Sequence, residues 1–135
     1  MVISTKGRYA LRILIDMAKC DQSTYVSLRD IAERQDLSEK YLESIIKLLV
    51  QSGLVVGLRG KNGGYKLAKD AKDITAWDVI SKTENDFYVV SCIGPDAPLC
   101  DRADSCATLP MWKDFSMELE RFFSKYTIAD LATKK

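Results

Sequence analysis

A very short break between two helical patterns restricts the folds that this chain can adopt. Ser27 and Asp30 are typical of a helix start, because a serine oxygen accepts a free backbone N–H and an acid three residues later favours the positive end of the helix dipole. A short helix over residues 28–35 is expected to follow, and Ser38 then caps a longer helix that stops at Gly53. Two helices joined by so short a turn predict a helix-turn-helix.

A hairpin pattern follows the second helix. The runs LVVGLRG and GYKLAKD are apolar or alternating, and they are separated by Lys61, Asn62, Gly63 and Gly64, whose glycines permit positive φ. An amphipathic helix over residues 6–19 precedes the helix-turn-helix, with apolar residues at helical spacing: Ala10, Ile13, Leu14 and Met17. The order predicts a winged helix-turn-helix, a fold that is mainly α with a small β-hairpin wing.

The last part of the chain carries a long apolar helix. A short helix capped at Thr75 runs to about Lys82, a loop follows, and a helix is expected from about Thr108 to Lys125. Its large side chains recur at spacings of three and four residues: Trp112, Phe115, Leu119, Phe122 and Tyr126. This stripe can pack on its own domain or on the same helix of a second chain, and its size favours a homodimer.

The start of the second turn-motif helix and the wing hold the candidate DNA-binding residues, Ser38, Lys40, Tyr41, Glu43 and Arg59. In a winged helix this helix can enter the major groove while the wing lies on the backbone or in the minor groove. Glu43 can accept a hydrogen bond from a cytosine amino group, Tyr41 can bond a phosphate, and Arg59 can reach a phosphate or the minor groove. Lys40 can equally be a solvated helix residue and Arg59 a surface charge, so the inference depends on the combination of helix and hairpin.

Three of the four cysteines lie in one loop of a chain that has no histidine. Cys92 and Cys100 have seven residues between them, and Cys100 and Cys106 have five, unlike the close cysteine pairs of zinc fingers. An iron–sulfur site normally takes four thiolates. Three can hold a cluster if an oxygen ligand, a small thiol or a second subunit supplies the fourth position; chance cysteines in a loop are the plainer alternative. Cys20 is expected to be a small buried or half-buried residue.

Charge and hydropathy bear on where the chain acts. Residues 1–70 carry 12 Lys and Arg against 8 Asp and Glu, and residues 71–135 carry 8 against 11, so the two parts have charges of +4 and −3. A basic front part suits contact with nucleic acid. No apolar run approaches the length of a membrane span, and charges interrupt the first helical segment, unlike a signal peptide. We therefore expect a cytoplasmic protein with no membrane partner, in which clustered cysteines bind metal or take part in redox chemistry.

The patterns divide the chain into three parts. Residues 1–82 are expected to form the winged helix-turn-helix DNA-binding domain, and residues 83–107 a cysteine-containing sensor loop. Residues 108–135 are expected to form the long C-terminal dimerisation helix and a short helix after it.

Several motifs occur together in the order that one family shows. They are STKGRYAL at 4–11, DIAERQDLSEKYLE at 30–43, GLVVGLRGKNGGYKLAKD at 53–70, VIS in the helix 77–81, the three-cysteine loop, and Thr108 with Trp112. On these motifs the chain resembles the IscR-like winged-helix iron–sulfur regulators of bacteria. The resemblance implies a homodimer that binds double-stranded operator DNA, with an iron–sulfur cluster in the loop beside the dimerisation helix. It places the DNA-reading positions of the family on Ser38, Tyr41, Glu43 and Arg59, and its cluster ligands on Cys92, Cys100 and Cys106.

Three positions depart from the pattern of that family. A histidine three residues after the last cysteine completes a 2Fe-2S site in the IscR branch, and Leu109 stands there in this chain. An N-terminal aspartate completes a 4Fe-4S site in the nitric-oxide-sensing branch, and Arg8 takes its place. Lys40 stands where IscR proteins have a serine. The cluster type, 2Fe-2S or 4Fe-4S, therefore stays open, and candidates for the fourth ligand are Asp101, Asp104 and an external thiol.

Two other functions are compatible with the cysteines. A cluster-free regulator of the same fold would use the thiols as a redox switch, or would respond to cysteine metabolism through a partner protein. A redox enzyme or electron carrier is disfavoured, because the chain has no histidine to act as a general base, no phosphate-binding glycine loop and no nucleophile dyad. We therefore predict a regulator and not an enzyme.

Overall fold

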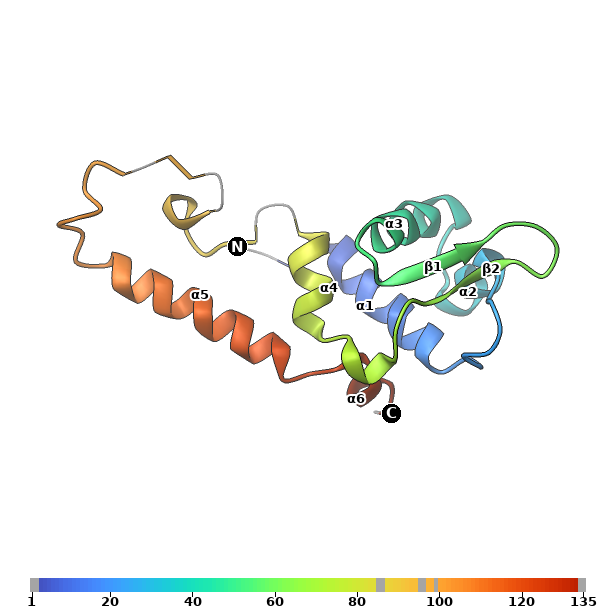
Figure 1. Ribbon diagram of the computed structural model, residues 1–135. Helices are drawn as coiled ribbons and strands as arrows, with labels where there is room; N and C mark the ends of the chain where they lie inside the picture. The colour runs from blue at the N-terminus through green and yellow to red at the C-terminus, as the bar shows by residue number, and fades with distance from the viewer. Residues whose placement is uncertain (1–2, 85–86, 95–96, 99, 134–135) are drawn as a thin grey trace.

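The computed structural model describes residues 3–84, 87–94, 97–98 and 100–133, and it confirms the predicted winged helix (Figure 1). In chain order the elements are α1 (Thr5–Ala18), α2 (Leu28–Gln35), α3 (Glu39–Gln51), β1 (Val55–Leu58), β2 (Gly64–Leu67), the 3-10 turn η1 (Ala71–Asp73), α4 (Ala76–Thr83), the 3-10 turn η2 (Ser91–Ile93), α5 (Leu109–Ser124) and α6 (Ile128–Ala132). Among these described segments, no helix combines the length and apolar character needed to cross a bilayer.

The helix-turn-helix forms because both of its helices have serine N-caps. The Ser27 side chain accepts a hydrogen bond from the Asp30 N–H at 3.1 Å, and the Ser38 side chain accepts one from the Tyr41 N–H, also at 3.1 Å. Between the two helices Asp36 adopts a left-handed conformation with φ of 54°, which ends α2 and turns the chain toward α3. The buried face of α3 consists of Leu42, Ile45, Ile46 and Leu49.

The wing is an antiparallel hairpin whose register pairs Val55 with Leu67 and Leu58 with Gly64. The segment before α2 extends it, because the Val26 N–H donates to the Tyr65 carbonyl and the Tyr65 N–H donates to the Val26 carbonyl, both at 2.8 Å. Gly64 has φ of +147°, and a Cβ atom there would lie 2.3 Å from the Val26 carbonyl oxygen. Glycine is therefore required at this position, and the contact fixes the wing against the start of α2.

The core of the domain surrounds α1. Ala10, Ile13, Leu14 and Met17 of α1 are all buried, as their helical spacing predicted. The chain returns to this core at its end, because α6 packs on α1 and its Ile128 is fully buried. Two hydrogen bonds fix α6 beside the start of α4: the Ala76 N–H donates to the Tyr126 carbonyl and the Ile128 N–H donates to the Ile74 carbonyl, each at 2.8 Å.

In contrast to α6, α5 projects away from the domain (Figure 1). Its C-terminal end is next to α6 and its N-terminal end carries the cysteine loop, which lies far from the wing. None of its described residues is buried, although Phe123 contacts Phe87, which in turn contacts Trp77 of α4, at ring-centroid distances of 6.2 and 5.7 Å. The helix thus has aromatic contacts near its base and an open surface along its length.

An ion pair between the buried carboxylate of Asp16 and the exposed guanidinium of Arg34 joins α1 to the helix-turn-helix. The carboxylate of Asp16, whose side chain is 6% exposed, accepts hydrogen bonds from Nε and Nη2 of Arg34 and, at 2.9 Å, from Nε2 of Gln35. The hydrogen bond to Asp16 raises the pKa of the Arg34 guanidinium. The pair therefore fixes the end of α2 against α1.

Replacement of Asp16 by asparagine is expected to lower the free energy of unfolding by about 2 kcal/mol, because Arg34 and Gln35 lose a charged acceptor that is shielded from water. Equilibrium unfolding in urea measures this change. Asp73→Asn, at an exposed position of η1, is the matched control and should leave stability nearly unchanged. Equal stability of the two variants would contradict the structural role of the pair.

Candidate nucleic-acid interface and cysteine pocket

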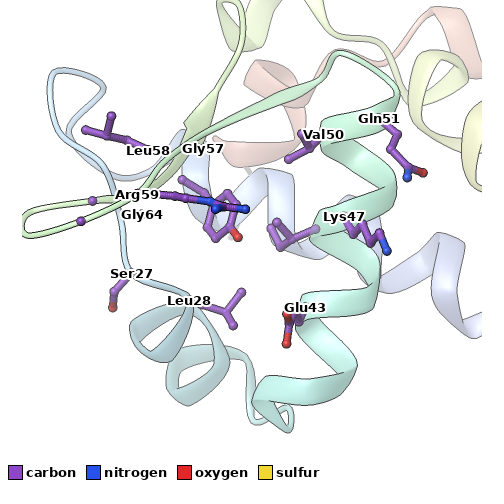
Figure 2. A pocket seen from close by; sticks show the side chains of 14 residues that line it. Ser27, Leu28, Glu43, Lys47, Val50, Gln51, Gly57, Leu58, Arg59 and Gly64 are labelled. Carbon is purple, nitrogen blue, oxygen red and sulfur yellow. The ribbon is translucent and has the colours of Figure 1, made fainter.

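A groove of about 670 Å³ lies between α3 and the wing (Figure 2). Helix α3, the hairpin and the start of α2 contribute its lining, and the hairpin takes its position from the Val26–Tyr65 hydrogen bonds. Part of this lining is apolar: Leu28, Ile46, Val50, Leu58 and Tyr65. The groove is thus a feature of the helix-turn-helix and the wing together, which neither element would form alone.

Glu43 and Arg59, two of the candidate residues, both line this groove. Glu43 is exposed on α3 in its N-terminal half, and Arg59 is exposed just after β1. Figure 2 shows Arg59 directed from the wing toward α3. A carboxylate on the helix and a guanidinium on the wing are therefore presented on one side of the molecule, as base reading and backbone contact require.

The remaining candidates, Ser38, Lys40 and Tyr41, lie at the start of α3 and are not part of the groove lining. The Ser38 hydroxyl serves as the helix cap. Tyr41 is half-buried and its ring packs edge-on against Tyr9 at 5.9 Å, so it also has a structural role. Lys40 is exposed.

The groove lining also includes three residues that the sequence patterns did not indicate as DNA-binding: Lys47, Val50 and Gln51. They follow Glu43 by four, seven and eight residues, so they lie on the same exposed side of α3, opposite the buried face. Figure 2 shows Lys47 and Gln51 directed away from the wing and Val50 toward it. Helical spacing counted from Glu43 would have identified all three.

The three loop cysteines line a second cavity, of about 430 Å³, at the other end of the molecule. We call it the cysteine pocket: it is lined by Cys92, Ile93, Gly94, Ala97, Pro98, Cys100, Ala103, Cys106, Leu109, Lys113 and Ser116. Cys92 lies in η2, Cys106 lies just before α5, and Leu109, Lys113 and Ser116 come from α5 itself. Cys92 and Cys100 are exposed and Cys106 is half-buried, so all three thiols are open to reagents or ligands.

Cys106 is hydrogen-bonded at the start of α5. Its Sγ lies 3.5 Å from the Thr108 hydroxyl, and hydrogen bonding by that hydroxyl and by the backbone N–H groups of Thr108 and Leu109 lowers the pKa of the Cys106 thiol. These N–H groups belong to the start of α5, where the helix dipole also favours an anion. A lowered pKa favours the thiolate, which is the form that binds metal and attacks disulfides.

The donor atoms of the cysteine pocket suit an iron–sulfur cluster. Three thiols line one cavity, and thiolates are the ligands that iron–sulfur clusters take. They do not form a ready metal site, because within the described ranges no three His, Cys, Asp or Glu side chains are grouped closely enough to hold a metal ion. Asp101 and Asp104 do not contribute to the lining. Among the residues that the structure describes, the polar side chains that do, besides the cysteines, are Lys113 and Ser116.

A helix-turn-helix, a hairpin wing and the groove between them define a winged-helix DNA-binding protein. The profile of the Rrf2 family, described as an iron-dependent transcriptional regulator, matches residues 3–134. The chain therefore belongs to the Rrf2 family of transcriptional regulators.

Individual relatives agree with this assignment. The chain is 36% identical to the HTH-type transcriptional regulator IscR of Serratia proteamaculans, over 100% of this chain and 81% of that protein. Among solved structures, IscR of T. potens has a TM-score of 0.71 and 34% identity, with 97% of this chain and 85% of that chain covered. CymR of B. subtilis, described as its global cysteine regulator, has a TM-score of 0.75 and 34% identity, with coverage of 98% and 97%. The predicted IscR-like resemblance is confirmed, and the chain is a DNA-binding transcriptional regulator and not an enzyme.

Proposed function

We propose that the chain is a homodimeric, sequence-specific regulator that reads double-stranded operator DNA with α3 and the wing and is controlled through the cysteine pocket. The observation that carries the proposal is the shared groove, in which Glu43 of α3 and Arg59 of the wing lie on one exposed side of the domain. A protein that binds chromosomal DNA in this way acts in the cytoplasm of a bacterium.

In this proposal the N-terminal half of α3 enters the major groove. Glu43 accepts a hydrogen bond from a cytosine amino group, and the exposed Lys40 lies one turn before it. Ser38 and Tyr41 lie at the helix start, where a backbone N–H, the serine hydroxyl and the tyrosine hydroxyl can meet a phosphate. Arg59 contacts the backbone or the minor groove from the wing.

Glu43→Ala is expected to change the preferred sequence, because loss of a carboxylate that accepts from cytosine removes about 1–3 kcal/mol of discrimination at one base pair. Arg59→Ala is expected to weaken binding to all duplexes, since a backbone contact carries no sequence information and a minor-groove contact carries little. Fluorescence anisotropy measures both effects, on duplexes enriched by the wild-type protein from a random pool. If neither substitution alters affinity or preference, the assignment of the interface is wrong.

The dimer is proposed to form along α5. Met111, Phe115 and Phe122 are 52%, 44% and 49% exposed, and their positions place them on one side of the projecting helix. Large apolar side chains exposed together on an extended helix are typical of a surface that another chain covers. A two-fold dimer would present two copies of α3 to an inverted DNA repeat.

The control element is proposed to be an iron–sulfur cluster held by Cys92, Cys100 and Cys106. When bound, such a cluster would have a charge and a stability that depend on iron, oxygen or other oxidants. The protein supplies the coupling, because the cysteine pocket joins the segment after α4 to the first turns of α5. Ligation there would constrain how α5 lies relative to α4, and so the distance between the two copies of α3 in a dimer.

A cluster-free thiol switch is the second candidate. Two observations favour it: the similarity to CymR, described as a cysteine regulator, and the lowered pKa of the Cys106 thiol, which favours reaction with oxidants. In this case oxidised protein would carry a disulfide or mixed disulfide at the cysteine pocket and no iron. Mass spectrometry of protein purified without oxygen, then treated with an oxidant, distinguishes the two mechanisms.

A further inference from the structure

The exposed side of α3 has two edges of different character. Lys40 and Lys47 are seven residues apart, which is about 10 Å or two turns along the helix, so they share one edge. Lys47 is exposed and directed away from the wing (Figure 2). The other edge faces the groove and is apolar, with Val50 exposed to 40% opposite the wing.

Across the groove, Arg59 is the basic residue of the described lining that comes from the wing. Positive charge therefore flanks α3 on both sides, from Lys40 and Lys47 on one edge and from Arg59 beyond the apolar edge. Glu43 lies between them. A carboxylate repels phosphates, so the middle of this surface suits the amino group of a base and its two flanks suit phosphates.

The two backbones of a duplex lie on either side of the major groove, so a helix that enters the groove has phosphates on both flanks. We propose that Lys47 is a phosphate-binding positioning residue, which with Lys40 holds the edge of α3 against one DNA strand while Arg59 holds the other. The apolar groove between Val50 and Leu58, which is 49% exposed, then receives deoxyribose rather than phosphate. This inference rests on the proposed function and deepens it, because it separates positioning residues from the base-reading Glu43.

The test is the salt dependence of DNA binding by the full chain, measured by anisotropy on an enriched duplex and on a random-sequence duplex. Lys47→Gln removes one phosphate contact per subunit, so the slope of log K against log salt should become shallower by about 0.9 per bound subunit. For each contact that is lost, the ratio of the binding constant at 0.1 M salt to the binding constant at 1 M salt should be about eightfold smaller for the variant than for the wild type. The loss of affinity should be the same for both duplexes. Lys47→Arg should have the salt slope of the wild type.

Lys72→Gln is the matched control, because Lys72 is exposed in the same domain but lies in η1, outside the groove lining. Its salt slope should equal that of the wild type. An unchanged slope for Lys47→Gln, or a loss confined to the enriched duplex, would overturn the inference while wild-type binding still supports the proposed function. A wild-type chain that binds neither duplex would overturn both.

Discussion

Phe115→Asp is expected to convert the protein from a dimer to a monomer and to lower its affinity for a two-half-site operator by a factor of about 10² to 10⁴. Phe115 is 44% exposed on α5, and a carboxylate there would be buried without a partner in a dimer interface. The domain itself should stay folded, because none of the described residues of α5 is buried. Analytical ultracentrifugation measures the oligomeric state, and anisotropy measures the affinity.

Met117→Asp is the matched control for this substitution. Met117 is 58% exposed and lies two residues further along α5, which at 3.6 residues per turn places it on the opposite side of the helix. Met117→Asp should therefore leave both the oligomeric state and the operator affinity nearly unchanged. If Phe115→Asp remains a dimer, or if both variants dissociate equally, the dimer does not form along the proposed stripe.

The second large effect is expected at the cysteine pocket. Cys106→Ala should abolish the bound iron and the visible absorbance of protein purified without oxygen, because a cluster with only two protein thiolates is poorly held. Cys92→Ala and Cys100→Ala should behave in the same way. Iron analysis and absorbance spectroscopy on the isolated protein measure this without any assay of DNA binding.

Cys20→Ala provides the control for the loss of iron. Cys20 lies just after α1, where its Sγ donates to the Asp16 carbonyl oxygen at 3.4 Å and is 3.5 Å from the Arg34 guanidinium. It is not among the residues of the cysteine pocket, so its loss should leave the iron content unchanged. Wild-type protein that is colourless and free of iron after anaerobic purification and reconstitution would instead favour the thiol switch.

Most of the fold could be predicted because its determinants are local. The serine caps at Ser27 and Ser38 and the glycine-rich turn at the wing each act within a few residues, so helix starts and hairpin were correctly placed. The turn differed in detail. Positive φ occurs at Gly60, Asn62 and Gly64. At Gly64 the carbonyl of Val26, which belongs to a distant segment, lies close to the backbone, and a local pattern cannot indicate that contact.

The features of the fold and of the cysteine pocket that the sequence did not indicate depend on contacts between distant segments. The burial of Ile128 against α1 requires the chain to return after α5 to its starting domain, which no local pattern specifies. The loop cysteines could be recognised as a group, but their common cavity also needs Lys113 and Ser116 of α5. Lys47 is different, because its spacing of four residues from Glu43 places it on the exposed side of α3 without reference to any distant segment.

Selection of binding sites from a random duplex pool tests whether the protein reads DNA as a homodimer, because an enriched inverted repeat requires both sequence reading and dimerisation. A homodimer that reads DNA with two copies of α3 should enrich an inverted repeat whose half-site centres are about 34–36 Å, or a multiple of that distance, apart. The enriched sites should bind at least about 10³ times more tightly than random DNA at physiological salt. Recovery of no common sequence, or of a single half-site without symmetry, would contradict sequence-specific binding by a homodimer.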